Sequence, residues 1–300
     1  MKKNTKFIMG LDGGGTKTLA RLIRLKDNRQ WQSIQGATSL TNDYHLALKS
    51  VTDACEDLFA LAECQPDQVS AVFGVAGAGD SQVVGRFESD LGIPFAHLDI
   101  VSDAKISLYG ANQGRPVAVV ALGTGSVGMS MLADGSQRHI GGWGFCIGDE
   151  GGGAKLGYGA VQKLLLELDW YGCGESPLGQ RLASRVGACR ESALQWLAQA
   201  KPGDYGALAP DVFSLKDTCE VAREVLQDHA YNVEQLIDRT RADSALPLVL
   251  LGGLAGATKS LLSTPTKNII ITAKGDALDG ACLLAGQYCQ SPNPGGCDPL

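Results

Sequence analysis

The stretch Phe7-Ile-Met-Gly-Leu-Asp-Gly-Gly-Gly-Thr16 decides the fold, because it joins an apolar run of strand length to a glycine-rich turn. The residues that follow, 18–25, favour a second strand. The same arrangement returns at Val117-Ala-Val-Val-Ala-Leu-Gly-Thr-Gly-Ser126 and continues into 127–132. The repeat predicts two related halves, each of which opens with a β-hairpin.

The rest of the chain alternates between apolar runs of strand length and segments with helical spacing. Expected strands, several rich in Val and Ile, lie at 71–76, 98–101, 248–251 and 269–271. Expected helices include 48–62 and 161–168. This alternation predicts an α/β fold. The turn-like Gln113-Gly-Arg-Pro116 marks the boundary, which gives domains at 1–115 and 116–300.

Composition narrows the class of protein. The chain has 300 residues, 44% of them hydrophobic and 19% charged, and a formal net charge of -6. A negative net charge without a basic stripe argues against nucleic acid as a partner. The sequence has neither a secretory signal nor an apolar stretch of about 18 residues, so we expect a cytoplasmic protein without a membrane partner. The nine cysteines form no CxxC pair and predict free thiols.

The first glycine turn, Asp12-Gly-Gly-Gly-Thr-Lys-Thr18, has two interpretations. It is not a P-loop, because Thr16 separates the last glycine from Lys17. It is either a tight hairpin, for which Asp-Gly is a common turn pair, or a phosphate-binding loop. In the second case its glycines would supply positive φ angles and bare backbone amides.

Two further glycine clusters can also be interpreted either as structural turns or as ligand-binding loops. Gly123-Thr-Gly-Ser126 forms the turn of the second expected hairpin, and two such turns could hold one triphosphate from both sides. Leu251-Gly-Gly-Leu-Ala-Gly256 follows an expected strand, where it is either a strand-to-helix turn or a surface that an adenine ring can approach.

Taken together, these segments resemble the sugar kinase, heat-shock and actin ATPase superfamily, in particular its branch of N-acetylglucosamine kinases and related BadF-type ATPases. The matching segments are 10–16, 101–104, 123–126, 141–144, 148–151 and 251–254. The resemblance implies two actin-like, ribonuclease H-like domains with an active-site cleft between them. It also implies that the final helix, 277–288, packs back onto the N-terminal domain, and that the protein is a homodimer.

The resemblance further implies that the cofactors are ATP and Mg²⁺. Asp12 would help to place Mg²⁺, and the terminal phosphates would lie against Gly14, Gly15 and Thr16. The second phosphate loop would be Gly123 with Thr124, and Gly252 with Gly253 would border the adenosine. Mg²⁺ suits this role because it binds one or two carboxylates together with phosphates. We assign no nucleotide contact in 201–228, where the match is least clear.

Asp103 is the candidate general base. It follows the expected strand 98–101, at the carboxyl end where ligands gather in open α/β sheets. An aspartate there can accept the proton of an attacking hydroxyl during phosphoryl transfer. The structural alternative is that Asp103 caps the helix that begins near Ala104.

For the sugar, the resemblance implies contacts from six residues: Asn42, Ser126, Gly142, Trp143, Gly144 and Asp149. The alternatives are core packing for Trp143 and a solvated helix start for Asp149 with Glu150. Val127 stands where these relatives carry Asn, so the choice between N-acetylglucosamine and glucosamine stays open.

The expected activity is therefore phosphorylation of an amino sugar by ATP, at the 6-hydroxyl that is usual in the family. A BadF-type activator ATPase is a second hypothesis, although no cysteine pattern suggests its iron-sulfur cluster. A sugar sensor without turnover is a third, and it would be expected to lack Asp12 or Asp103, which are both present.

Overall fold

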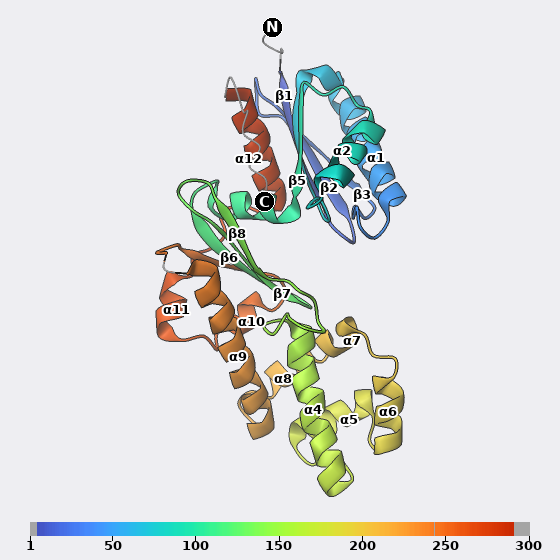
Figure 1. The fold of residues 1–300 in the computed structure, drawn as a ribbon, viewed down its shortest axis with the longest axis vertical. Helices are drawn as coiled ribbons and strands as arrows, with labels where there is room; N and C mark the ends of the chain where they lie inside the picture. Colours follow the sequence, from blue (N-terminus) through green and yellow to red (C-terminus); the bar gives the residue numbers. More distant parts are fainter. Residues whose placement is uncertain (1–4, 243, 291–300) are drawn as a thin grey trace. The chain divides into compact units, whose positions relative to one another are not determined.

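The computed structural model describes residues 5–242 and 244–290 and divides them into two compact units. One unit contains residues up to Arg115 together with 273–290, and the other is Pro116–Thr272. The α/β class predicted from the sequence is confirmed, because each unit is built on a mixed sheet covered by helices (Figure 1).

The first unit has a five-stranded sheet in the order β3-β2-β1-β4-β5. Its strands are β1 (Phe7–Gly13), β2 (Thr18–Arg24), β3 (Gln30–Gln35), β4 (Val69–Val75) and β5 (His97–Ser102). β1, β4 and β5 run parallel, whereas β2 and β3 are antiparallel to their neighbours. Every residue of β4 is buried, as expected for a central strand with helices on both faces.

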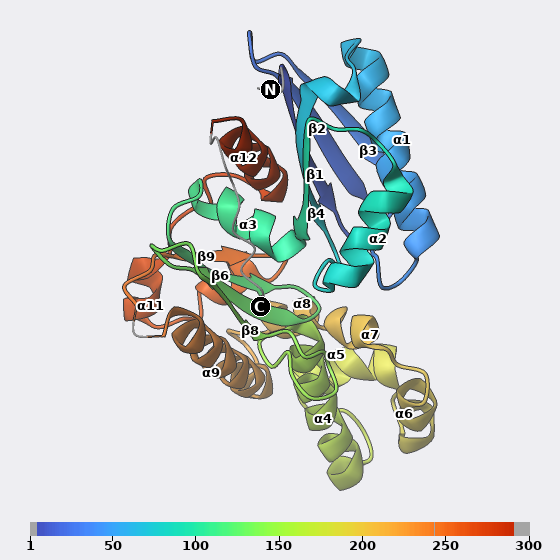
Figure 2. The ribbon, with the colours of Figure 1, turned by 45° about the horizontal axis from the view of Figure 1, so that its top comes forward.

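Four helices cover this sheet: α1 (Tyr44–Ala62), α2 (Ser81–Leu91), α3 (Asp103–Asn112) and α12 (Ala277–Gln290). α1 and α2 lie on one face and α12 on the other, as both ribbon views show (Figure 2). α12 packs closely on α3, where a Cβ on Gly110 would come within 1.8 Å of the carbonyl oxygen of Asp276. Only glycine fits this crossing.

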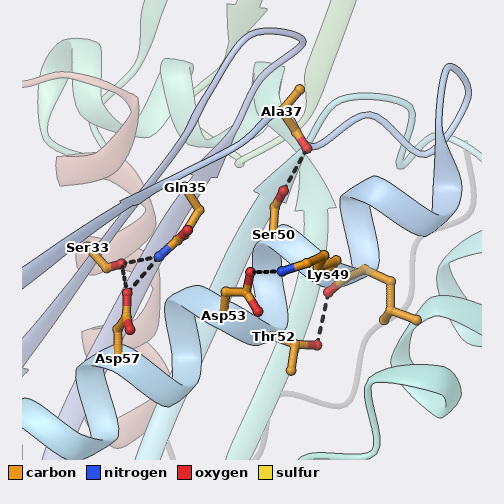
Figure 3. Close-up of polar contacts among 9 residues, drawn as sticks. Ser33, Gln35, Ala37, Lys49, Ser50, Thr52, Asp53 and Asp57 are labelled. Atoms are coloured by element: carbon orange, nitrogen blue, oxygen red, sulfur yellow. Dashed lines mark hydrogen bonds and ion pairs between the residues drawn. The ribbon is translucent and has the colours of Figure 1, made fainter.

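Polar contacts fix α1 to β3 and to the segment that follows β3 (Figure 3). The Asp57 carboxylate accepts hydrogen bonds from Ser33 at 2.9 Å and from Gln35 at 2.6 Å. The Ser50 hydroxyl donates to the carbonyl of Ala37 at 3.1 Å. These bonds hold the chain between β3 and α1, which borders the first glycine turn.

The second unit repeats this topology in a four-stranded sheet, β8-β7-β6-β9. Its strands are β6 (Val117–Leu122), β7 (Ser126–Met131), β8 (Gln137–Gly141) and β9 (Leu248–Leu251). β9 runs parallel to β6, as β4 does to β1. The expected strand at 269–271 is wrong: Ser263 caps a short helix, α11 (Thr264–Ile269), so only Ile270 remains to form a single bridge with Leu248.

A set of helices is inserted between β8 and β9. They are α4 (Gly153–Tyr171), α5 (Pro177–Val186), α6 (Arg190–Leu197), α7 (Pro202–Gly206), α8 (Ala209–Ser214) and α9 (Glu220–Arg241), and α10 (Ala255–Lys259) follows β9. α9 covers the sheet with buried residues such as Val233 and Ile237. Buried residues of α4, α5, α6, α7, α8 and α9 form a separate apolar core around Leu164 and Leu182. Within the described ranges, no helix has both the length and the apolar character needed to span a membrane.

Candidate functional site

The first unit gathers carboxylates where its parallel strands end. Asp12 lies on β1 beside Gly74 of β4, and Asp103 follows β5 directly. The carboxyl ends of parallel strands meet at one edge of a sheet, which is where ligands bind in such folds. Asp276 precedes α12 and belongs to the same electrostatic group.

Asp12 carries the clearest electrostatic signal of this group. Burial raises the pKa of its carboxyl, the charges of Asp103 and Asp276 raise it further, and Lys17 opposes them. Ionisation of Asp12 is therefore less favourable in the folded protein than in water, and a bound cation would relieve that cost. No three His, Cys, Asp or Glu side chains in the part of the chain that the structure describes form a complete metal site. The carboxylates thus suit a cation that takes its other ligands from phosphate and water.

Asp103 is exposed and is the first residue of α3. The N-cap is Ser102, whose hydroxyl accepts from the Lys105 amide at 3.2 Å. One carboxylate oxygen of Asp103 accepts from the Ala104 amide at 2.9 Å. The other oxygen has no hydrogen-bond partner among the described residues.

The β1–β2 turn is open where the sequence analysis places phosphate. A Cβ on Gly15 would meet no atom within 4 Å, and one on Gly14 only the Lys17 carbonyl oxygen at 3.6 Å. The expectation that these glycines supply positive φ is wrong, because neither Gly14 nor Gly15 adopts it. Instead, Gly13 is required by contact, since its Cβ would lie 2.9 Å from Thr38.

In the second unit the equivalent turn, between β6 and β7, caps a helix. The carbonyl of Gly123 accepts from the Gly153 amide at 2.8 Å, and that of Thr124 accepts from the Ala154 amide at 2.9 Å. A Cβ on Gly152 would lie 2.6 Å from the Thr124 carbonyl oxygen. The start of α4 therefore packs against the turn so tightly that only glycine fits, while Gly123 itself faces open space.

Asp149 is held beside this turn in a strained conformation. Its φ is 65°, a value that non-glycine residues rarely adopt. A Cβ on Gly125 would come 2.3 Å from its Oδ2 atom. Its Oδ1 atom is buried without a hydrogen-bond partner in the described structure. A strained residue with an orphaned buried oxygen is typical of a functional site, which makes Asp149 a candidate for one.

Gly252 and Gly253, which follow β9, differ in the space that their backbone leaves for a side chain. Gly252 has φ 93° and leaves no room for a Cβ, which would lie 2.3 Å from the Leu122 carbonyl oxygen. Gly253 has no atom within 4 Å of the same position. The Leu254 amide donates to Leu122 at 3.1 Å, so this turn follows the end of β6 closely.

The loop after β8 carries the expected sugar contacts. Gly142 and Gly144 have φ values of 72° and 87°, and Trp143 is 75% exposed, so the alternative of core packing for Trp143 is wrong. Beneath the loop, Val127 lies against Gly142, whose Cβ would be 3.1 Å from it. Phe145 anchors the loop by stacking on Tyr205 at 5.4 Å between ring centroids.

Two expected sugar residues have different surroundings. Ser126 is buried, and its hydroxyl accepts from the Gly151 amide at 3.2 Å, so it holds the start of α4. Asn42 is exposed in the first unit, just before the N-cap Asp43 of α1. The second unit thus brings 123–126, 149 and 252–253 together, and the first unit brings Asp12 and Asp103 together.

Two parts of the candidate site were not predicted from the sequence. Gly151-Gly-Gly153 was not recognised as the partner of the second turn, although three successive glycines before a helix are an available signal. Asp276 also has a local role at the start of α12: its carboxylate accepts from the Asp279 amide at 2.8 Å, and the Asp279 carboxylate accepts from the Asp276 amide at 3.0 Å. Such paired bonds are typical of a helix start, and only the fold places Asp276 near Asp12.

Known proteins resemble this chain over nearly its full length. The chain is 29% identical to the glucosamine kinase GspK of Vibrio cholerae, over 94% of this chain and 96% of that protein. It is 26% identical to the N-acetyl-D-glucosamine kinase of Dictyostelium discoideum, over 93% and 98%. A crystal structure from Chromobacterium violaceum, proposed to be an N-acetylglucosamine kinase, matches with a TM-score of 0.80 at 31% identity and covers 94% of this chain and 99% of its own. Residues 9–285 match the BadF/BadG/BcrA/BcrD ATPase family, and the chain therefore belongs to that family.

Proposed function

We propose that this protein is an ATP-dependent amino-sugar kinase that phosphorylates N-acetylglucosamine or glucosamine at the 6-hydroxyl. One observation carries the proposal: Asp103 has a free carboxylate oxygen at the sheet edge where Asp12 and the open turn Gly14–Thr16 also lie. The near full-length similarity to two amino-sugar kinases indicates the acceptor.

In the proposed reaction, the sugar hydroxyl attacks the γ-phosphorus of ATP while Asp103 accepts its proton. The new O–P bond forms as the bond to the β,γ-bridging oxygen breaks, which leaves ADP and the sugar phosphate. Gly14, Gly15 and Thr16 are proposed to lie against the terminal phosphates, with Gly123 and Thr124 as the second loop. The amides of Gly15 and Thr16 are the proposed donors, because the Gly14 amide already donates to the Lys17 carbonyl at 3.1 Å. Gly252 and Gly253 would border the adenosine.

Asp12 is the proposed carboxylate for Mg²⁺, which when bound would neutralise phosphate charge during transfer. Asp149 and the loop that carries Gly142, Trp143 and Gly144 are proposed to bind the sugar. The orphaned Oδ1 atom of Asp149 is the acceptor that a sugar hydroxyl would satisfy. Asn42 and Ser126 remain proposals for the same role, Ser126 through the turn that it braces.

The choice between the two sugars is proposed to depend on residue 127. The Val127 side chain offers no hydrogen bond beneath Gly142, at a position where the family resemblance implies Asn. The similarity to a glucosamine kinase over nearly the whole chain favours glucosamine as an equal candidate.

A coupled assay with Mg-ATP, glucosamine, N-acetylglucosamine and glucose tests the proposal. We expect an amino sugar to exceed glucose in kcat/KM by at least about tenfold. Asp103→Asn should lower kcat by about 10³-fold and leave sugar binding measurable by calorimetry. The matched control is Asp67→Asn, at an exposed aspartate in the short 3-10 helix Pro66–Gln68 of the same unit. No turnover on any sugar discards the kinase, and a brown, iron-containing protein would favour an activator ATPase.

The resemblance also leads us to propose a homodimer. Size-exclusion chromatography with light scattering measures the oligomeric state directly.

A further inference from the structure

Thr38 lies in the connection between β3 and α1, beside the first glycine turn. Its side chain is fully buried, and so is that of Thr18, the first residue of β2. A buried hydroxyl is unusual in a connecting segment, because such segments usually run over the surface. The reaction as proposed uses neither threonine.

The two hydroxyls form a hydrogen-bond chain that fixes Thr38 against β2. The Thr18 hydroxyl donates to the Gly36 carbonyl at 2.7 Å. A hydroxyl has one proton, so the 2.5 Å bond between the two hydroxyls must be donated by Thr38. The Thr38 side chain also contacts Gly13, where a Cβ would lie 2.9 Å from the Thr38 Cβ atom. Thr38 is therefore held both by a hydrogen bond and by packing.

The Thr38 amide determines the direction of the Gly15 amide. It donates to the Gly14 carbonyl at 2.8 Å, so that carbonyl points toward Thr38. The Gly14–Gly15 peptide bond is trans, and a trans peptide directs its C=O and N–H bonds to opposite sides. The Gly15 N–H therefore points away from Thr38. It has no acceptor within residues 5–242 and 244–290.

The second hairpin turn has the same kind of anchor. The Gly123 carbonyl accepts from the Gly153 amide at 2.8 Å, and Thr124 follows Gly123. The same peptide geometry directs the Thr124 N–H away from Gly153. In each unit, one carbonyl of the turn is bound on one side and the next amide is directed to the other. The anchor recurs although its donor differs, which is a connecting segment in the first unit and the start of α4 in the second.

We propose that Thr38 is a positioning residue for phosphoryl transfer: its amide directs the Gly15 N–H toward the terminal phosphate oxygens, and its hydroxyl holds that amide in place. Backbone N–H groups in a turn suit an anion such as phosphate. A donor that is oriented before ATP binds costs less to order than one in a mobile turn. The inference rests on the proposed function, since it takes the ligand at this turn to be ATP.

Calorimetric binding of the β,γ-imido analogue of ATP with Mg²⁺ tests the inference without a sugar. Thr38→Val removes the hydroxyl and keeps the β-branched shape, and we expect it to weaken binding by about tenfold. Thr38→Ser keeps the hydroxyl and should stay within about threefold of the parent protein. Thr52→Val is the control, since the Thr52 hydroxyl donates to the Leu48 carbonyl within α1 at 2.9 Å (Figure 3). Unchanged affinity in Thr38→Val, or an equal loss in both Thr38 variants, overturns the inference.

A double-mutant cycle tests the hydrogen-bond chain. Thr18→Val removes the acceptor of the Thr38 hydroxyl and should weaken binding of the analogue about as much as Thr38→Val does. The double variant should bind within about twofold of either single variant, since all three lack the same bond. Losses that multiply would show that the two threonines act separately, which overturns the role of the Thr38 hydroxyl.

Steady-state kinetics distinguish positioning from a general loss of structure. Thr38→Val should raise the KM for ATP by about tenfold and leave kcat and the KM for the sugar within about threefold, because the Gly15 amide would contact phosphate both before and during transfer. A general loss would lower kcat in step with the folded fraction and leave both KM values unchanged. That result overturns the inference.

Amide exchange in the ligand-free protein tests the anchor itself. The residue 38 amide donates to Gly14, and its protection factor should fall by about tenfold in Thr38→Val and stay within about threefold of the parent value in Thr38→Ser. An unchanged protection factor in Thr38→Val overturns the inference. The measurement needs no ligand, so it decides the role of the Thr38 hydroxyl even if the parent protein phosphorylates no sugar, an outcome that counts against the kinase.

Discussion

The two units share a strand order but use the glycines of their first hairpin turns differently. In the first unit, Gly14 and Gly15 have free space around them. In the second unit, Gly125 has no such space, because Asp149 lies against it. Gly152 is also confined, by the carbonyl of Thr124.

This difference separates two reasons for a glycine that look identical in sequence. A confined glycine is required by packing, and its replacement should cost stability. An open glycine is not required by packing, so a ligand can approach its backbone. The first turn is therefore compatible with the proposed phosphate loop, whereas most of the second turn supports α4 and Asp149.

The largest expected effect is on the stability of the second unit. Gly152→Ala should lower the free energy of unfolding by about 3 kcal/mol, because the new Cβ would meet backbone atoms that cannot move aside. The melting temperature should fall by roughly 6–10 °C, measured by calorimetry. Gly256→Ala in α10, where a Cβ meets no atom within 4 Å, is the control and should not destabilise. Equal melting temperatures for the two variants would remove the distinction between confined and open glycines.

The next effect is on activity in the first unit. Gly15→Ala should leave the melting temperature within about 1 °C of the parent, since the site is open, but should lower kcat/KM for ATP by about tenfold by obstructing the backbone amide. Gly85→Ala, an open glycine within α2, is the control for kinetics. An active Gly15→Ala enzyme with unchanged constants would show that this turn is a simple hairpin.

A smaller effect concerns sugar selectivity. Val127→Asn places an amide beneath Gly142, and we expect it to change the ratio of kcat/KM between N-acetylglucosamine and glucosamine by about threefold to tenfold, in favour of the acetylated sugar. Val127→Thr is the matched variant that keeps the β-branched shape. If the ratio stays constant in both variants, residue 127 does not contact the sugar.

The smallest effect is a pH-dependent gain in stability. The pKa of Asp12 is raised in the folded protein, chiefly by burial, so its ionisation opposes folding as pH rises through that pKa. Asp12→Asn should therefore raise the melting temperature of the ligand-free protein by about 1–3 °C at pH 7. The gain should vanish below the ordinary pKa of aspartate, where Asp12 is protonated in both states. A gain that persists there, or a loss at pH 7, would show that the carboxylate is already compensated.

The sequence by itself determined the α/β class, the two hairpins and most strand positions, because apolar runs and glycine turns are local signals. It also singled out Asp103, which follows an apolar strand, whereas the role of Asp12 was implied by the family resemblance. It misassigned 269–271, where a capped helix with Pro265 competes with a strand and leaves one bridging residue.

Only the tertiary structure decided which glycines are confined, that Ser126 braces α4 and that Trp143 is exposed. It also placed Asp276, which comes from the far end of the sequence, beside Asp12. The physical reason is that local propensity depends on near neighbours in the chain. Burial, close contact and the coupling of charges depend instead on segments that meet only after folding.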